Sequence, residues 1–128
     1  MSAMSDYLEL EVLDHVLGTG AYTMPSNVYI GLSTGSFGDD NSGTELSGSN
    51  YSRQTIAFAA ASSGSAATNA TVTFPTASGS WGAVSHWGLF DASSSGNLLV
   101  HGSFASSKTI ASGDVLRVNS GDLTVTAA

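Results

Sequence analysis

From Asn27 onward, apolar and polar residues alternate with a period of two in short runs that are separated by turn residues. The clearest run is Val28, Ile30 and Leu32 alternating with Tyr29 and Gly31, and further runs follow around 54–58, 72–74, 98–104 and 123–125. This alternation is typical of half-buried strands, and clusters of Gly, Ser, Asn and Asp between the runs indicate turns. The sequence therefore predicts a mainly β protein, an antiparallel β-sandwich over residues 27–126.

One segment, residues 5–18, has helical periodicity instead. Leu10, Leu13 and Leu17 recur at a spacing of three to four residues, which places them on one face of a helix. Asp6 followed by Glu9 resembles a capping box at the start, and Gly18 suits the end. We expect this N-terminal α-helix to pack across the sheet or against a neighbouring subunit.

The length and charge of the chain restrict its function further. Its 128 residues form a single domain, 1–128, with a net charge of -7 and only three cations, Arg53, Lys108 and Arg117. Because binding to nucleic acid or to an anionic membrane needs clustered cations, we expect neither partner. The absence of cysteine excludes disulfides and thiolate metal sites.

The longest unpatterned segment, residues 33–50, predicts a long mobile loop. Its most acidic part, residues 39–45, offers oxygen ligands but departs from the EF-hand pattern, so a solvated loop and a calcium site both remain open. At the N-terminus of the chain, Met4 follows Met1 closely. Residues 1–3 can therefore be interpreted as a dispensable leader.

We predict that the protein is not an enzyme and holds no cofactor or metal. Its 23 serines and three histidines make chance proximity common, and a hydrolase would need one Ser and one His to converge. His86 and His101 lie on neighbouring predicted strands, where a metal or pH-sensitive pair is the alternative to ordinary strand histidines.

The aromatic residues allow two interpretations. Trp81, Trp87, Phe90 and Tyr51 could form a platform that stacks on a sugar ring, or the tryptophans could belong to the core and a sheet end. Arg53 stands alone in a predicted strand, so we expect it to pair with a carboxylate across a strand or a subunit boundary and to fix register.

Several phrases, taken in order, resemble small bacteriophage structural proteins that are labelled tail fibre or capsid decoration proteins. They cover residues 7–125 and include 28–34, 44–48, 51–54, 72–77, 84–92 and 121–125. The resemblance implies a virion component, an oligomeric β-sandwich of jelly-roll type, and no catalytic motif.

The leading hypothesis is a capsid decoration or cement protein, a homotrimer that binds the major capsid protein outside the head. It would be assembled in the host cytoplasm and located in the virion. Its interface candidates are Tyr7, Leu8, Leu10, Leu13, Leu17, Arg53, Trp81 and Trp87. The alternative is a tail fibre or tail-tip module that binds host-surface glycan.

Overall fold

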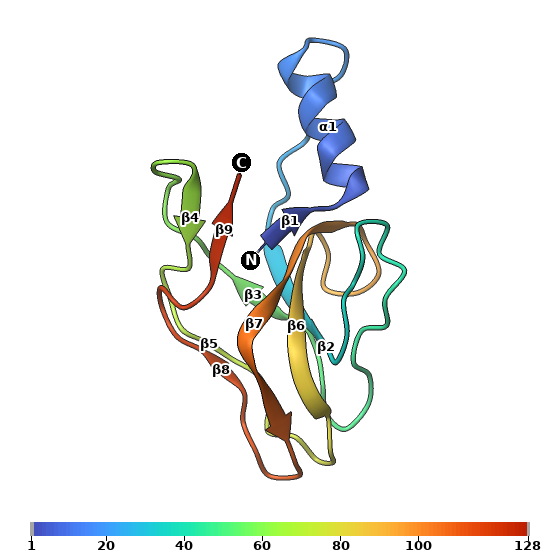
Figure 1. Ribbon diagram of the computed structural model, residues 1–128, viewed down its shortest axis with the longest axis vertical. Helices are drawn as coiled ribbons and strands as arrows, with labels where there is room; N and C mark the ends of the chain where they lie inside the picture. The colour runs from blue at the N-terminus through green and yellow to red at the C-terminus, as the bar shows by residue number, and fades with distance from the viewer. Residues whose placement is uncertain (1, 128) are drawn as a thin grey trace.

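The computed structural model describes residues 2–127 and is mainly β, with one N-terminal helix (Figure 1). Within that range the elements follow the order β1 (Ser2–Met4), α1 (Asp6–Val16), β2 (Val28–Ser33), β3 (Gln54–Ile56), β4 (Ser65–Ala67), β5 (Val72–Thr73), β6 (Gly82–Phe90), β7 (Leu98–Ile110), β8 (Arg117–Val118) and β9 (Thr124–Thr126).

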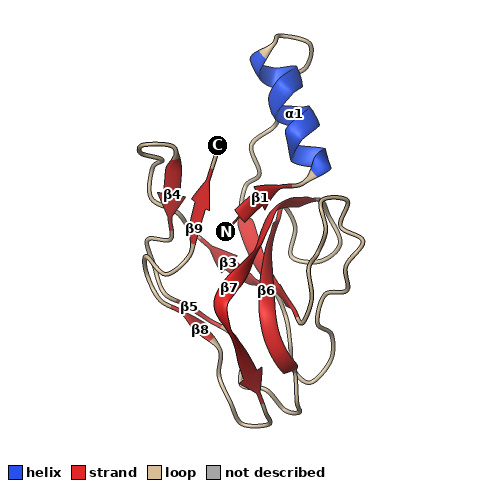
Figure 2. Ribbon diagram, viewed as in Figure 1, coloured by secondary structure: helices blue, strands red, loops and turns tan. Residues whose placement is uncertain are grey.

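The strands form one large sheet and two small ribbons (Figure 2). The large sheet has the order β1-β7-β6-β2-β3, and every pair in it is antiparallel. The ribbons are β4-β9 and β5-β8, also antiparallel. The predicted antiparallel β class is therefore confirmed, while the sandwich of jelly-roll type stays a prediction.

The core lies on one face of the large sheet. Ile30 and Leu32 of β2 are cross-strand partners of Leu89 and Trp87 of β6, and all four side chains are buried. Val72 and Val118 from the β5-β8 ribbon, together with other residues of the second layer, belong to the same cluster. The period-two alternation thus places its apolar side chains between the large sheet and the ribbons.

Both tryptophans belong to this core, and their assignment to an exposed interface was wrong. Trp81 is 5% exposed and Trp87 is 3% exposed. The Trp81 indole Nε1 donates to the backbone oxygen of Ser49 at 2.9 Å, which satisfies its only polar atom on burial. Burial of a large aromatic ring removes apolar surface from water, and this stabilises the folded state.

The opposite face of the large sheet carries a second, smaller cluster. Gly31 and Gly88 are cross-strand partners there, and Phe37, Phe90 and Leu98 form a buried group. A Cβ on Gly88 would meet atoms of all three side chains at 2.9–3.2 Å. The glycine therefore leaves the space in which these rings lie.

The long loop predicted over 33–50 folds back onto the chain, and its mobility stays a prediction. Phe37 is buried against the sheet. The Leu46 N–H donates to the Leu32 oxygen at 2.9 Å, and the Ser33 hydroxyl donates to the Thr44 oxygen at 2.6 Å. These contacts hold both ends of the loop against β2.

The residues before the helix form an edge strand rather than a leader. Ser2, Ala3 and Met4 pair with Gly102, His101 and Val100 of β7. The interpretation of residues 1–3 as dispensable is therefore corrected for Ser2 and Ala3, whereas Met1 lies outside the described residues.

Helix α1 projects from one end of the molecule (Figures 1 and 2). Ser5 is its N-cap: the Ser5 hydroxyl oxygen accepts from the Leu8 N–H at 3.2 Å and donates to the Leu98 oxygen at 2.5 Å. No side chain of α1 is buried, so the helix does not pack across the sheet of its own chain as one expectation had it. Among the described residues, no helix is long and apolar enough to cross a membrane.

Candidate functional site

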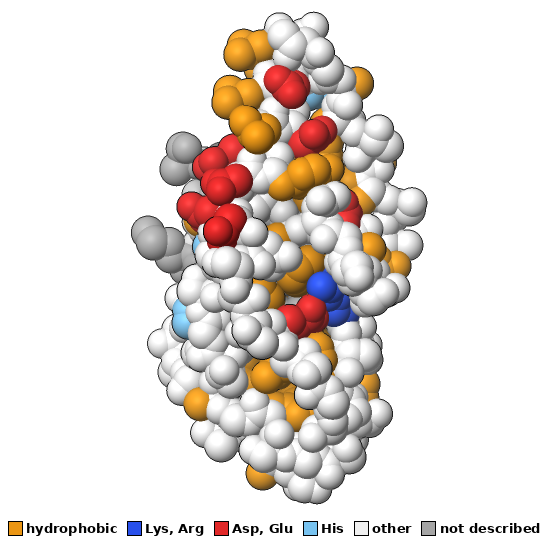
Figure 3. Space-filling view, turned by 90° about the vertical axis from the view of Figure 1, so that its right-hand side faces the viewer, with side chains coloured by type: hydrophobic (Ala, Val, Ile, Leu, Met, Phe, Trp, Pro, Cys, Tyr) orange, Lys and Arg blue, Asp and Glu red, His pale blue; other side chains and the backbone are white. Residues whose placement is uncertain are grey.

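The outer face of α1 carries three exposed leucines. Leu10 is 64% exposed, Leu13 55% and Leu17 71%. Their helical spacing puts them on one line, with Glu9 on one side and Asp14 on the other. We call Leu10, Leu13 and Leu17 the leucine stripe. Figure 3 shows hydrophobic and acidic side chains gathered on this projecting end.

The inner face of α1 anchors the helix to the body of the molecule. Tyr7 and Leu8 are half-buried and pack against the main core. The five predicted helix residues therefore divide into two classes. Tyr7 and Leu8 attach the helix, whereas the leucine stripe faces outward with no cover from the described part of the chain.

An apolar groove of about 580 Å³ lies beside the base of the helix. Its walls come from the segment after α1, from β3 and from the β4-β9 ribbon. Residues that line it include Leu8, Met24, Val28, Phe58 and Val125. Met24 is 82% exposed, so the apolar surface continues from the groove to the outside of the molecule.

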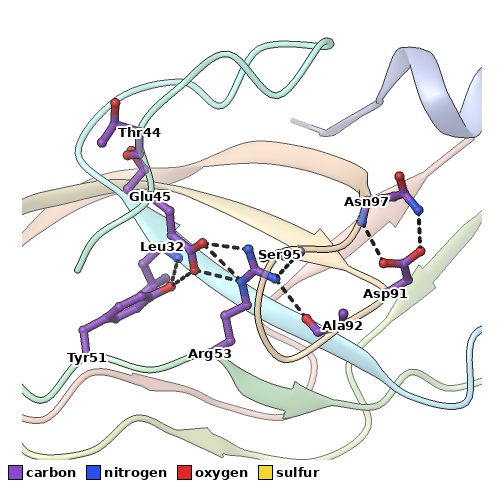
Figure 4. Close-up of polar contacts among 10 residues, drawn as sticks. Leu32, Thr44, Glu45, Tyr51, Arg53, Asp91, Ala92, Ser95 and Asn97 are labelled. Atoms are coloured by element: carbon purple, nitrogen blue, oxygen red, sulfur yellow. Dashed lines mark hydrogen bonds and ion pairs between the residues drawn. The ribbon is translucent and has the colours of Figure 1, made fainter. Parts of the chain in front are cut away.

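Arg53 is the centre of a polar cluster that ties two loops to the large sheet (Figure 4). Its Nη2 and Nε donate to the Glu45 carboxylate at 2.7 and 2.9 Å. Its Nη1 donates to the backbone oxygens of Ala92 and Ser95 at 2.9 and 2.7 Å. The guanidinium lies 3.6 Å from the centre of the Phe90 ring, a cation–π contact.

The cluster also fixes Tyr51. The Tyr51 hydroxyl donates to Glu45 Oε2 at 2.5 Å and accepts from the Leu32 N–H at 2.9 Å. Burial, and next the hydrogen bond to Glu45, raise the pKa of the Tyr51 phenol. Arg53 thus has the carboxylate partner that the sequence predicted, and this partner lies within its own chain. The Tyr51 ring stacks on Phe74, so that face of the ring is not available to a sugar.

The predicted stacking platform does not assemble. Trp81 and Trp87 are buried, and Phe90 is covered by Arg53 and by Phe37. The sequence could have indicated the burial of Trp87, because this residue lies on the same face of β6 as the core residue Leu89. The platform interpretation was therefore wrong for these side chains.

The acidic loop uses its carboxylates for contacts within the chain. Asp39 Oδ1 lies 2.7 Å from His101 Nε2, and Asp40 Oδ1 accepts from the Ser42 N–H at 3.1 Å. Hydrogen bonds from Ser42 lower the pKa of the Asp40 carboxyl. Within residues 2–127, no three His, Asp or Glu side chains come together in a group that could hold a metal ion.

One motif was missed in the sequence. Gly31-Leu32-Ser33-Thr34-Gly35 matches the G-x-S-x-G pattern of hydrolase nucleophiles, and Ser33 lies opposite His86 across β2 and β6. However, Ser33 is buried and its hydroxyl donates to the Thr44 oxygen. His86 Nδ1 instead lies 2.7 Å from the Ser85 hydroxyl oxygen. The hydroxyl of Ser33 is neither exposed nor directed to the histidine.

The remaining two cations line a second surface. The sequence did not indicate this surface, because the two cations lie on different strands and come together only in the fold. Lys108 near the end of β7 and Arg117 of β8 line a hollow of about 200 Å³. Its other residues are Phe104, Ala105, Ser106, Val118 and Asp122. We call these seven residues the basic hollow. In the described chain, neither cation forms an ion pair.

One protein family resembles almost the whole chain. The model of a protein family described as "Podophage GP4 fiber I protein gp80" matches residues 3–126. This range includes α1, all strands except the first residue of β1, and both surfaces described above. No protein among the curated sequences matches the chain.

Proposed function

The chain belongs to the podophage GP4 fiber I protein gp80 family, and from this premise we propose that it is a subunit of a fibre on a bacteriophage virion. The family identifies a phage virion structural protein. The observation that carries the finer proposal is the match over residues 3–126, because it covers nearly the whole fold and the family is described as a fibre protein.

The projecting helix supports a role in assembly. A protein that is only 10% charged and that exposes three leucines on one helix presents a surface suited to contact with other proteins. The buried Phe37 and the Arg53 cluster hold the loops around this end in place. We therefore propose that the fibre subunit attaches to its neighbours through the leucine stripe.

Capsid decoration, the homotrimer and binding to the major capsid protein remain predictions. Fibre and decoration differ in where the protein lies on the particle, so labelling of purified virions distinguishes them. A gold-labelled antibody to this chain should mark fibres, with an antibody to the major capsid protein as control for the head. Labelling of the head surface instead would refute the fibre proposal and favour decoration.

We infer a structural rather than a catalytic role. The support is the position of Ser33, whose hydroxyl is buried and donates to a backbone oxygen, since a nucleophile must be accessible and paired with its base. The purified protein should not hydrolyse activated esters. Hydrolysis that is lost in a Ser33→Ala variant would overturn this inference.

A further inference from the structure

We propose that copies of this chain associate head to tail, with the leucine stripe of one copy seated on the basic hollow of the next. The proposal names a second copy of the chain as the partner of the leucine stripe, and it rests on the proposed function, in which this stripe serves assembly. Two observations carry it: the charges of the two surfaces are complementary, and the two surfaces lie apart on the molecule, one on α1 and the other along β7 and β8.

The charge distribution favours a second copy as the occupant. The chain has ten carboxylates and three cations. Arg53 is bound to Glu45, which leaves Lys108 and Arg117, and both line the basic hollow. Four of the carboxylates lie on α1, where Glu9 and Asp14 flank the leucines. The two surfaces therefore attract each other in a chain that otherwise repels itself.

The hollow also offers apolar surface to the leucines. Phe104 is half-buried, Ala105 is exposed, and Val118, which also lines the hollow, is buried. The aliphatic stems of the two cations add to this surface. The one carboxylate in the hollow, Asp122, accepts a hydrogen bond from the Asn119 N–H at 3.3 Å. A helix with leucines in the middle and carboxylates at both sides fits this pattern of apolar floor and basic rim.

The positions of the two surfaces define the geometry of the contact. In Figure 1 the longest axis is vertical, with α1 at the top and the end of β7 at the bottom. The basic hollow lies along the second half of β7 and along β8, on the side of the molecule and away from α1. A contact between two different surfaces is heterologous, so each bound copy still offers a free surface to the next copy, as growth of a fibre requires.

Sedimentation of charge variants is the first test. The double variant Lys108→Gln with Arg117→Gln should raise the dissociation constant of self-association about tenfold, as the loss of two partly exposed ion pairs does. The matched control is Ala60→Glu with Ala61→Glu, which makes the same change in net charge on an exposed loop. Equal weakening in both variants, or none in the first, would overturn the proposal.

Mixing two variants tests the head-to-tail geometry itself. Leu10→Ser with Leu13→Ser removes the stripe, and Lys108→Glu with Arg117→Glu reverses the hollow. Each variant alone should sediment as a monomer, whereas the mixture should form a one-to-one complex through the intact surface of each. All four residues are exposed, and thermal unfolding of each variant checks that it is folded. A mixture that stays monomeric would overturn the proposal.

The outcome for self-association is separate from the outcome for the proposed function. If gold labelling marks fibres while the wild-type chain remains monomeric at millimolar concentration, the proposed function stands and the head-to-tail contact is refuted. If the chain associates as described but labelling marks another part of the virion, the contact stands and the fibre assignment is refuted.

Discussion

Replacement of Arg53 tests how far a single side chain stabilises the loops of this protein. The Arg53→Met variant leaves the Glu45 carboxylate without a cation and the backbone oxygens of Ala92 and Ser95 without their donors. Removing one partner of a buried ion pair costs about 3–5 kcal/mol. The Glu45 side chain is 24% exposed, so water can solvate part of the unpaired carboxylate. We therefore expect the free energy of unfolding to fall by about 3 kcal/mol.

This loss corresponds to a large change in melting temperature. For a chain of 128 residues, an unfolding entropy of about 0.27 kcal/mol/K converts about 3 kcal/mol into about 11 °C. Thermal unfolding followed by circular dichroism, together with urea titration, measures both quantities. The matched control is Arg117→Met, an exposed arginine with only a 3.4 Å contact to the Thr73 hydroxyl, which should change stability by less than about 0.5 kcal/mol.

A double-mutant cycle isolates the pair itself. The variant Glu45→Gln, alone and with Arg53→Met, completes the cycle. The coupling energy should exceed about 1 kcal/mol because the two side chains share three hydrogen bonds, at 2.7, 2.9 and 3.2 Å. A cost below about 1 kcal/mol for Arg53→Met, or a coupling energy near zero, would refute the reasoning.

Three further predictions concern the pH dependence, the packing and the helix cap. Burial and the hydrogen bond to Glu45 raise the pKa of the Tyr51 phenol. The stability that this pKa shift contributes is therefore complete below about pH 10 and is lost as the pH rises further. In urea titrations from about pH 8 to 11, the free energy of unfolding should decline less steeply for Tyr51→Phe than for wild type. Gly88→Ala should cost about 1–3 kcal/mol, since its Cβ meets side chains at 2.9–3.2 Å, whereas Gly35→Ala, with nothing within 4 Å, should not; equal melting temperatures would contradict this. Ser5→Ala should cost about 1–2 kcal/mol and speed hydrogen exchange at the amides of the first turn of α1, and unchanged exchange there would show that the cap is dispensable.

The sequence predicted the elements that follow a simple period. The helix predicted over 5–18 is observed as Asp6–Val16, and the alternation at Val28–Leu32 became β2 with Ile30 and Leu32 buried. Periodicity succeeds at these places because a spacing of three to four residues is specific to a helix and a spacing of two is specific to a strand.

The errors occurred where neighbours far apart in the chain decide the structure. Phe37 is a single aromatic residue in a polar loop, and its burial depends on the space above Gly88, which is fifty-one positions away. Ser2–Met4 became a strand because β7 offers an open edge. Ser65–Ala67 lacks large apolar residues and is a strand only through pairing with β9.

The candidate surfaces were predictable to different degrees. The leucine stripe could be read from spacing, but its exposure could not, since the same pattern serves a helix packed on a sheet. The basic hollow was not predictable at all, because Lys108 and Arg117 meet only through the fold of β7 and β8. Arg53 carried a usable signal, a lone cation in an apolar strand, which indicated an ion pair.

The attachment of α1 has a mechanical consequence. The helix is joined to the large sheet at both of its ends, by Ser5 and β1 before it and by the segment that leads to β2 after it. A pulling force on the helix is therefore divided between the edge strand β1 and the interior strand β2, which is paired on both sides with β3 and β6. Rupture of the three-residue β1 pairing alone does not release the helix, so the tensile strength of a subunit held by α1 is set by an interior strand of the sheet rather than by its edge strand β1.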